Sequence, residues 1–175
     1  MRRKNLYVVE VDVYLIALSL PTSVINSVKL WKKTGDPATP LADVILQPES
    51  SRSVGTDRTK VAVTLKFVRS VTKDQIIQAF EDALIGCDKK AIADFRDAMS
   101  KVIDGDRGLK TGDILHFDWP KEGGLMISSE KRVTAEIQNP EVTRRMLEVY
   151  IDDVRTVSKD LVKCLKDNID KIETY

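Results

Sequence analysis

The chain has 175 residues, of which 42% are hydrophobic and 31% are charged. This length suits one domain with a hydrophobic core and is short for two, so we expect a single domain over residues 1–175. Lys and Arg number 28 against 27 Asp and Glu, which gives a formal net charge of +1. A domain that binds nucleic acid usually carries a clear basic excess, so we predict no nucleic-acid partner.

The first residues are basic, but the apolar run behind them is interrupted by Glu10 and Asp12. This makes a poor signal peptide, and nothing reaches the ~18 uninterrupted apolar residues of a membrane span. Cys87 and Cys164 are far apart and form no C-x-x-C motif, which favours free thiols in a reducing compartment. We therefore expect a soluble intracellular protein without a membrane span, cytoplasmic by default, with an organelle left open.

Two segments in the first part of the chain alternate with the period of a β-strand. Leu6–Leu18 places Glu10 and Asp12 on one face and the aliphatic residues Val9, Val11, Val13 and Leu15 on the other. From Pro21 onward the sequence is rich in turn residues, so we expect at most one short helix in this segment. A polar loop follows at Ser50–Arg58. Thr59–Val68 alternates again and predicts a second long strand over Thr59–Phe67.

The hydrophobic period changes at Thr72, where Thr72 and Gln75 have the spacing of a capping box. Apolar residues then follow at helical spacing as far as Gly86, which is placed to end the helix. The remaining predicted elements are a helix over 88–103, short strands over 113–119, 124–128 and 132–137, and helices over 140–150 and 158–169. Short connections between the three strands favour an antiparallel meander. Strands and helices grouped in blocks predict an α+β domain, an antiparallel sheet with helices packed on one face.

Catalytic and metal-binding motifs are not visible in the sequence. His116 is the only histidine, so neither a metal-ligand set nor a Ser-His-Asp triad has its usual partners. Glu10 and Asp12 could form a carboxylate pair for acid–base chemistry. They could equally be exposed, or paired with cations such as Lys60 and Lys66 on the next strand.

Four blocks of sequence, in this order, resemble the chalcone isomerase-like family. VDVYLIAL resembles the family's first conserved strand, G-V-Y-L, with Asp12 in place of the glycine. KVAVTLKFVRSVTKDQIIQAFEDAL resembles its long strand and first helix, and LKTGDILHFDWPKEGGLMISSEKRV resembles its G-D-x-I strand and meander. IQNPEVTRRMLEVYIDDVRTVSKDLVKCL resembles the closing helix pair. The resemblance covers most of the chain from Leu6 to Ile169 and implies the family's open-faced β-sandwich.

The resemblance also implies a ligand cleft between the first helix of the family pattern and the sheet. Thr143 falls on the family's Ser/Thr that lines this cleft, and Asn139 falls on the Asn just before it. Asn139 is also placed to cap a helix whose first residue is a proline, and both roles can hold together. Ile76 and Phe80 would supply the apolar wall, and Lys60 is a candidate anchor for a carboxylate.

The positions that carry ring closure in plant chalcone isomerases are not matched. The family pattern has an Arg, a Thr, a Tyr and an Asn at these positions. In this chain no Arg aligns with the first, and Val9 or Glu10 stands in place of the Thr. Gln75 or Ile76 stands in place of the Tyr, and Asp82 or Ala83 in place of the Asn. We therefore predict a protein that binds a small hydrophobic ligand, such as a fatty acid, without efficient chalcone cyclisation. The alternatives are an active isomerase with a rearranged site, a haem-binding relative, and a scaffold without a ligand. Apart from haem, no cofactor or metal is predicted.

Overall fold

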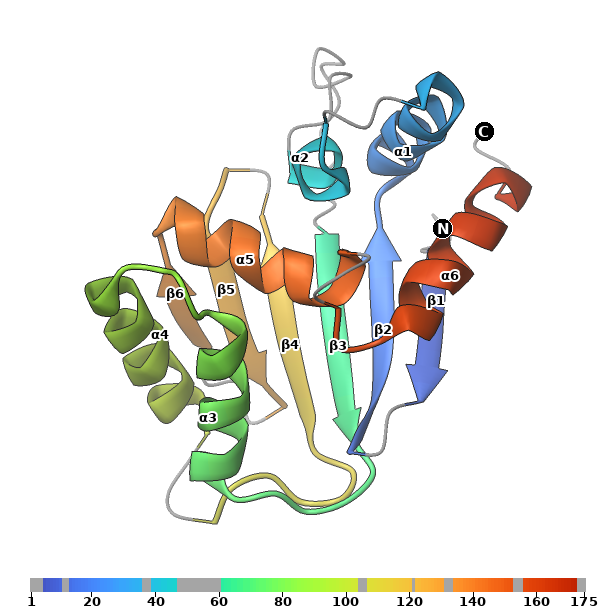
Figure 1. The fold of residues 1–175 in the computed structure, drawn as a ribbon. Coiled ribbons are helices and arrows are strands. Elements are labelled where there is room, and N and C mark those ends of the chain that lie inside the picture. Colours follow the sequence, from blue (N-terminus) through green and yellow to red (C-terminus); the bar gives the residue numbers. More distant parts are fainter. Residues whose placement is uncertain are drawn as a thin grey trace.

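The computed structural model describes residues 5–10, 13–35, 39–46, 61–103, 107–120, 122–130, 134–152 and 156–172. Within them, six strands form one antiparallel sheet in which each strand pairs with the next along the chain (Figure 1). The strands are β1 (Asn5–Glu10), β2 (Tyr14–Leu20), β3 (Val61–Phe67), β4 (Ile114–Trp119), β5 (Leu125–Ser129) and β6 (Thr134–Ile137). The antiparallel sheet and its final meander confirm the predicted fold class.

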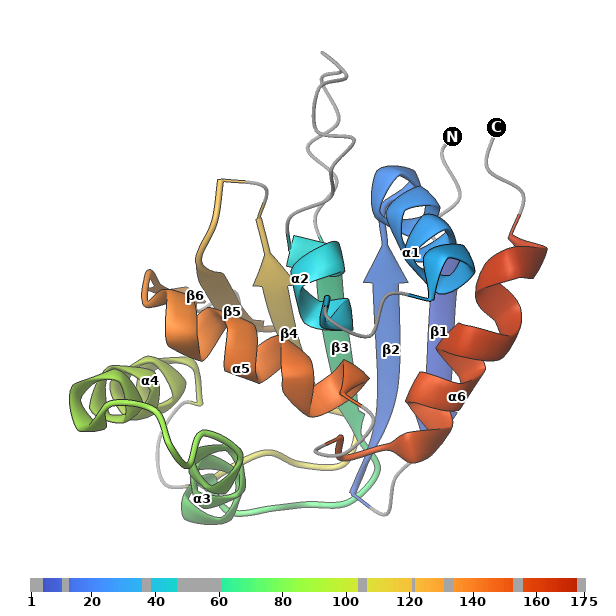
Figure 2. The ribbon, with the colours of Figure 1, turned by 45° about the horizontal axis from the view of Figure 1, so that its top comes forward.

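The helices lie on one face of this sheet, as Figures 1 and 2 show from two directions. α3 to α6 lie across that face, and α1 and α2 lie at the end of the sheet where β2 ends and β3 begins. Their bounds are α1 (Thr22–Thr34), α2 (Leu41–Leu46), α3 (Lys73–Ala83), α4 (Lys89–Val102), α5 (Pro140–Ile151), α6 (Lys159–Asn168) and the short 3-10 helix η1 (Ile169–Lys171). No helix in the described ranges is long and apolar enough to cross a membrane.

Alternating burial defines the face of the sheet that the helices cover. Along β3, the side chains of residues 61, 63, 65 and 67 are buried, and those between them are half-buried or exposed. The register sets Val63 opposite both Leu18 of β2 and Phe117 of β4, so the buried side chains form continuous rows across the strands. Burial of one apolar face against helices is the main stabilising term of such a layered domain.

The predicted strand Leu6–Leu18 is wrong, because the chain reverses within it. β1 and β2 form an antiparallel hairpin in which Glu10 lies opposite Leu15. The predicted apolar face is also wrong for β2, where Ile16, Leu18 and Leu20 are buried and Leu15 is only half-buried. Period-2 alternation continues through both strands of a hairpin, and β2 has apolar residues on both of its faces. The pattern therefore defined neither the turn nor the buried face.

The expectation of at most one short helix after Pro21 is also wrong. α1 has 13 residues and buries Val24, Ile25 and Val28. It ends at Gly35, which adopts a left-handed conformation with φ of 62° and donates its N–H to the Trp31 carbonyl. Glycine accepts this conformation without steric cost, so the turn residues end a full helix here and do not replace it. A second short helix, α2, follows.

Most of the predicted helix starts are confirmed. The Thr72 hydroxyl accepts the Gln75 N–H at 3.2 Å, and the Gln75 side chain accepts the Thr72 N–H at 3.0 Å, which completes the capping box. Ser158 caps α6 as predicted. α3 ends at Ala83, slightly before Gly86, which lies with φ of 101° in the turn towards α4. The predicted loop Ser50–Arg58 lies outside the described residues.

Candidate ligand-binding site

A row of aromatic side chains fills the layer between the sheet and the helices. Phe80 of α3 contacts Phe95 of α4 and Phe117 of β4, with ring centroids 6.0 and 5.2 Å apart. Phe117 in turn lies 6.3 Å from Tyr150 of α5. All four rings are buried. Helices α3, α4 and α5 are thus joined to the sheet through one continuous apolar core.

The row ends at the hydroxyl group of Tyr150. The Tyr150 hydroxyl is buried and makes no hydrogen bond within the described part of the chain. Burial raises the pKa of Tyr150 well above 10.0, and the nearby Tyr14 phenol raises it further. Tyr14, whose ring packs at 5.6 Å against Phe67, also has a pKa raised by burial. Both phenols therefore stay protonated and neutral at ordinary pH, as potential hydrogen-bond donors.

Asn139 and Thr143 are brought together at the start of α5. The Asn139 side chain accepts the N–H groups of Glu141 and Val142 at 3.0 and 3.1 Å, which confirms its role as a cap. The Thr143 hydroxyl donates to the Asn139 carbonyl at 2.8 Å. The Thr143 carbonyl accepts the indole N–H of Trp119 on β4, also at 2.8 Å. The polar start of this helix therefore fixes α5 against the sheet, and a ligand contact of Thr143 stays a prediction.

Ile76 and Phe80 lie in the same helix, α3, and are both only 5% exposed. They belong to the packed core, so an apolar ligand would have to replace contacts that they already make. Lys60, the predicted carboxylate anchor, lies outside the described residues. The structure thus joins Asn139 to Thr143 and places Ile76 and Phe80 side by side.

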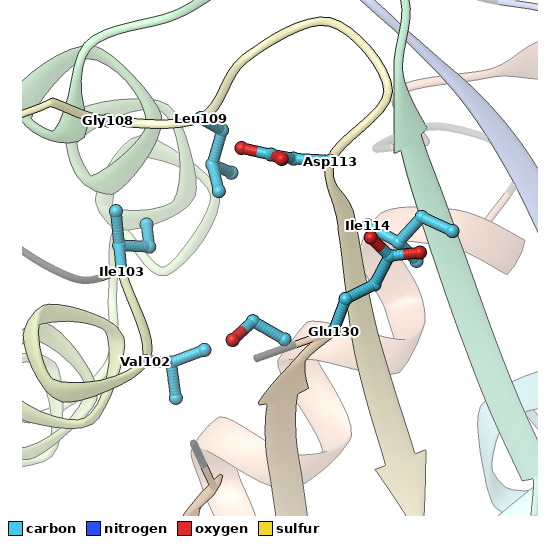
Figure 3. Close-up of a pocket in the computed structure, with 8 residues that line it drawn as sticks. Val102, Ile103, Gly108, Leu109, Asp113, Ile114 and Glu130 are labelled. Atoms are coloured by element: carbon cyan, nitrogen blue, oxygen red, sulfur yellow. The ribbon is translucent and has the colours of Figure 1, made fainter. Parts of the chain in front are cut away.

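A pocket of about 80 Å³ opens on the helix-covered side of the sheet, and Figure 3 shows its lining. It lies between the end of α4, the segment before β4, and the paired ends of β4 and β5. Its lining residues are Val102, Ile103, Gly108, Leu109, Asp113, Ile114, Ser129 and Glu130. Asn139, Thr143, Ile76 and Phe80, the four predicted residues that the structure describes, do not line this pocket.

The walls of the pocket combine apolar and polar surface. Val102, Ile103 and Leu109 are buried, and Ile114 is half-buried. The Ser129 hydroxyl is buried among them and has no hydrogen-bond partner in the described ranges. In native proteins, buried polar atoms almost always have a partner, so an unpaired hydroxyl that lines a cavity indicates space for a bound water or ligand atom.

One wall of the pocket depends on a tight backbone contact. Val71 and Leu109 form an isolated β-bridge in which each N–H donates to the other carbonyl at 2.9 Å. Gly108, next to it, has φ of 64°, and a Cβ at this position would lie 2.2 Å from the Val71 carbonyl oxygen. Only glycine fits there. The segment before β4 is therefore pinned close to the start of α3.

The lone histidine lies away from this side of the sheet. His116 alternates with the buried Leu115 and Phe117 of β4, so it faces the side without helices, where its Nδ1 lies 3.0 Å from the Thr64 hydroxyl. The described residues contain no group of three or more potential His, Cys, Asp or Glu metal ligands. Of the proposed carboxylate pair, Asp12 lies outside the described residues, as does the side chain of Glu10.

The sheet, the helix layer on one face and the small pocket under that layer define an α+β protein of the open-faced β-sandwich type. The sequence pattern of the family described as chalcone isomerase-like matches residues 45–165, which is more than half of the chain. The protein therefore belongs to the chalcone isomerase-like family.

One solved structure with a similar fold is a fatty-acid binding protein of Arabidopsis thaliana. The two share 12% sequence identity with a TM-score of 0.65, over 94% of this chain and 85% of that one. This likeness shows the shared fold. No curated protein matches the sequence.

Proposed function

We propose that this protein binds a small hydrophobic ligand, a fatty acid or a molecule of similar character, on the helix-covered side of its sheet. The observation that carries the proposal is the pocket of about 80 Å³, which is lined in part by apolar side chains and by the Ser129 hydroxyl, an atom without a hydrogen-bond partner among the described residues. The fold supports it, because a fatty-acid binding protein has the same architecture. Small-molecule sites commonly combine apolar walls with a few polar groups that orient the ligand.

The size of the pocket limits what it holds. An apolar cavity of roughly 150 Å³ accommodates a benzene molecule, and this pocket is about half that volume. It therefore suits one end of a chain-like ligand, with the rest of the chain lying across its open rim. Each methylene removed from water would contribute about 0.8 kcal/mol.

Efficient chalcone cyclisation has little support in the site. The plant reaction needs polar groups that stabilise a developing enolate oxygen. At the position of the family tyrosine, Gln75 uses its side-chain oxygen in the capping box, and Ile76 is buried. At the position of the family asparagine, Asp82 accepts a hydrogen bond from Gln78 at 2.8 Å and is exposed. Ile76 and the Asp82 carboxylate offer no donor to a bound substrate, and Gln75, whose amide nitrogen could donate, is exposed.

One observation favours the rearranged isomerase as a second candidate. The Tyr150 phenol is protonated and has no hydrogen-bond partner among the described residues, so it could donate to an enolate oxygen if a substrate entered the apolar layer. Following the absorbance of naringenin chalcone tests this function. Conversion at an enzyme-like rate that is lost in Tyr150→Phe would establish it. The haem alternative has less support, since the pocket lining contains no His or Cys.

Filling the pocket tests the ligand-binding proposal. Ser129→Leu should place an isobutyl group among the apolar side chains of the pocket and lower the affinity for a polarity-sensitive dye or a decyl-chain ligand at least about tenfold. Ser128→Leu is the matched control, because alternation along β5 turns Ser128 to the opposite face of the sheet. Equal binding by both variants and the unaltered protein would place the ligand elsewhere. No binding by the unaltered protein to fatty acids, flavonoids or haem would favour a scaffold.

A further inference from the structure

We draw no further inference here: the strongest candidate, the buried Tyr150 hydroxyl at the end of the aromatic row between α5 and the sheet, already carries the isomerase alternative, does not line the pocket of Figure 3, and is related to Tyr14 only by a pKa that burial and this second phenol raise.

Discussion

Replacing Tyr150 by Phe should stabilise the free protein, although it removes a polar group from the core of a native fold. The Tyr150 ring is fully buried and packs 6.3 Å from Phe117, and a phenylalanine ring keeps that contact. The hydroxyl has no hydrogen-bond partner in the described part of the chain. In the unfolded chain the same hydroxyl is bonded to water, so folding loses that bond without replacing it.

The magnitude follows from the cost of an unpaired buried polar group, about 1–3 kcal/mol. Removal of the oxygen leaves a small space that offsets part of the gain, so we expect the free energy of unfolding to rise by about 1 kcal/mol. For a chain of this size, that corresponds to a melting temperature higher by roughly 2–4 °C.

Urea denaturation at neutral pH measures the change. The midpoint should rise while the slope of the free energy with urea stays the same, because the exposed surface on unfolding hardly changes. A fall of more than about 1 kcal/mol in Tyr150→Phe would contradict the reasoning, since it would show that the hydroxyl makes a hydrogen bond to a water or ligand in solution.

The same phenol makes the stability depend on alkaline pH. Burial raises the folded-state pKa of Tyr150 above its unfolded value of 10.0. The stability linked to its protonation is therefore complete below pH 10.0 and is lost as pH rises from there towards the folded-state pKa. Tyr150→Phe lacks this loss, so its advantage over the unaltered protein should widen above pH 10.0, by up to about 1.4 kcal/mol per pH unit. A constant difference across that range would contradict the buried phenol.

Three further changes have expected outcomes. Phe80→Ala should lower the free energy of unfolding in urea by about 3–5 kcal/mol because Phe80 is a core ring, and a loss below about 1 kcal/mol would show that it is not. Gly108→Ala should lower the melting temperature and weaken ligand binding, because a Cβ would collide with the Val71 carbonyl; unchanged values would refute the tight contact. Cys87 should react with a thiol reagent more slowly than Cys164, because burial raises the pKa of the Cys87 thiol; the reverse order would contradict this.

The sequence predicted elements well where a local signal coincided with one-sided burial. β3 has its large apolar residues, at positions 61, 63, 65 and 67, on a single face that the helices cover, so the period-2 pattern located the strand. α3 has a capping box that the structure reproduces bond for bond. In both segments, the local preference and the tertiary contacts agree, which is the condition under which sequence patterns are informative.

α1 shows the opposite case. Its N-terminal cap is Pro21, which makes no side-chain hydrogen bond, and its first turn has no acidic residue. The usual start signals of a helix are therefore missing, while Gly35 and Pro37 suggested a turn-rich segment. The helix forms because Val24, Ile25 and Val28 are buried in the folded protein, and that burial is decided by residues far away in the chain.

The pocket was not predictable for a related reason. Its lining comes from four short segments, 102–103, 108–109, 113–114 and 129–130. They meet only because the Val71–Leu109 bridge pins one loop and the pairing of Leu115 with Ser129 aligns two strands. Hydrophobic periodicity within any one segment carries no information about such a meeting. The sequence around Gly108 indicated a break between two elements. In the structure, this segment forms one wall of the pocket.

The polar start of α5 has a consequence for ligand chemistry on this side of the sheet. The Thr143 hydroxyl already donates its proton to the Asn139 carbonyl, so towards a ligand it can only accept. The Asn139 side-chain oxygen is occupied by two backbone N–H groups. If Thr143 does contact a ligand, as the family pattern predicts, the ligand atom facing it must be a donor. An ionised fatty acid has no donor at its head group, whereas an amine or an alcohol has one. The start of α5 would therefore favour a ligand with a hydrogen-bond donor at its head group.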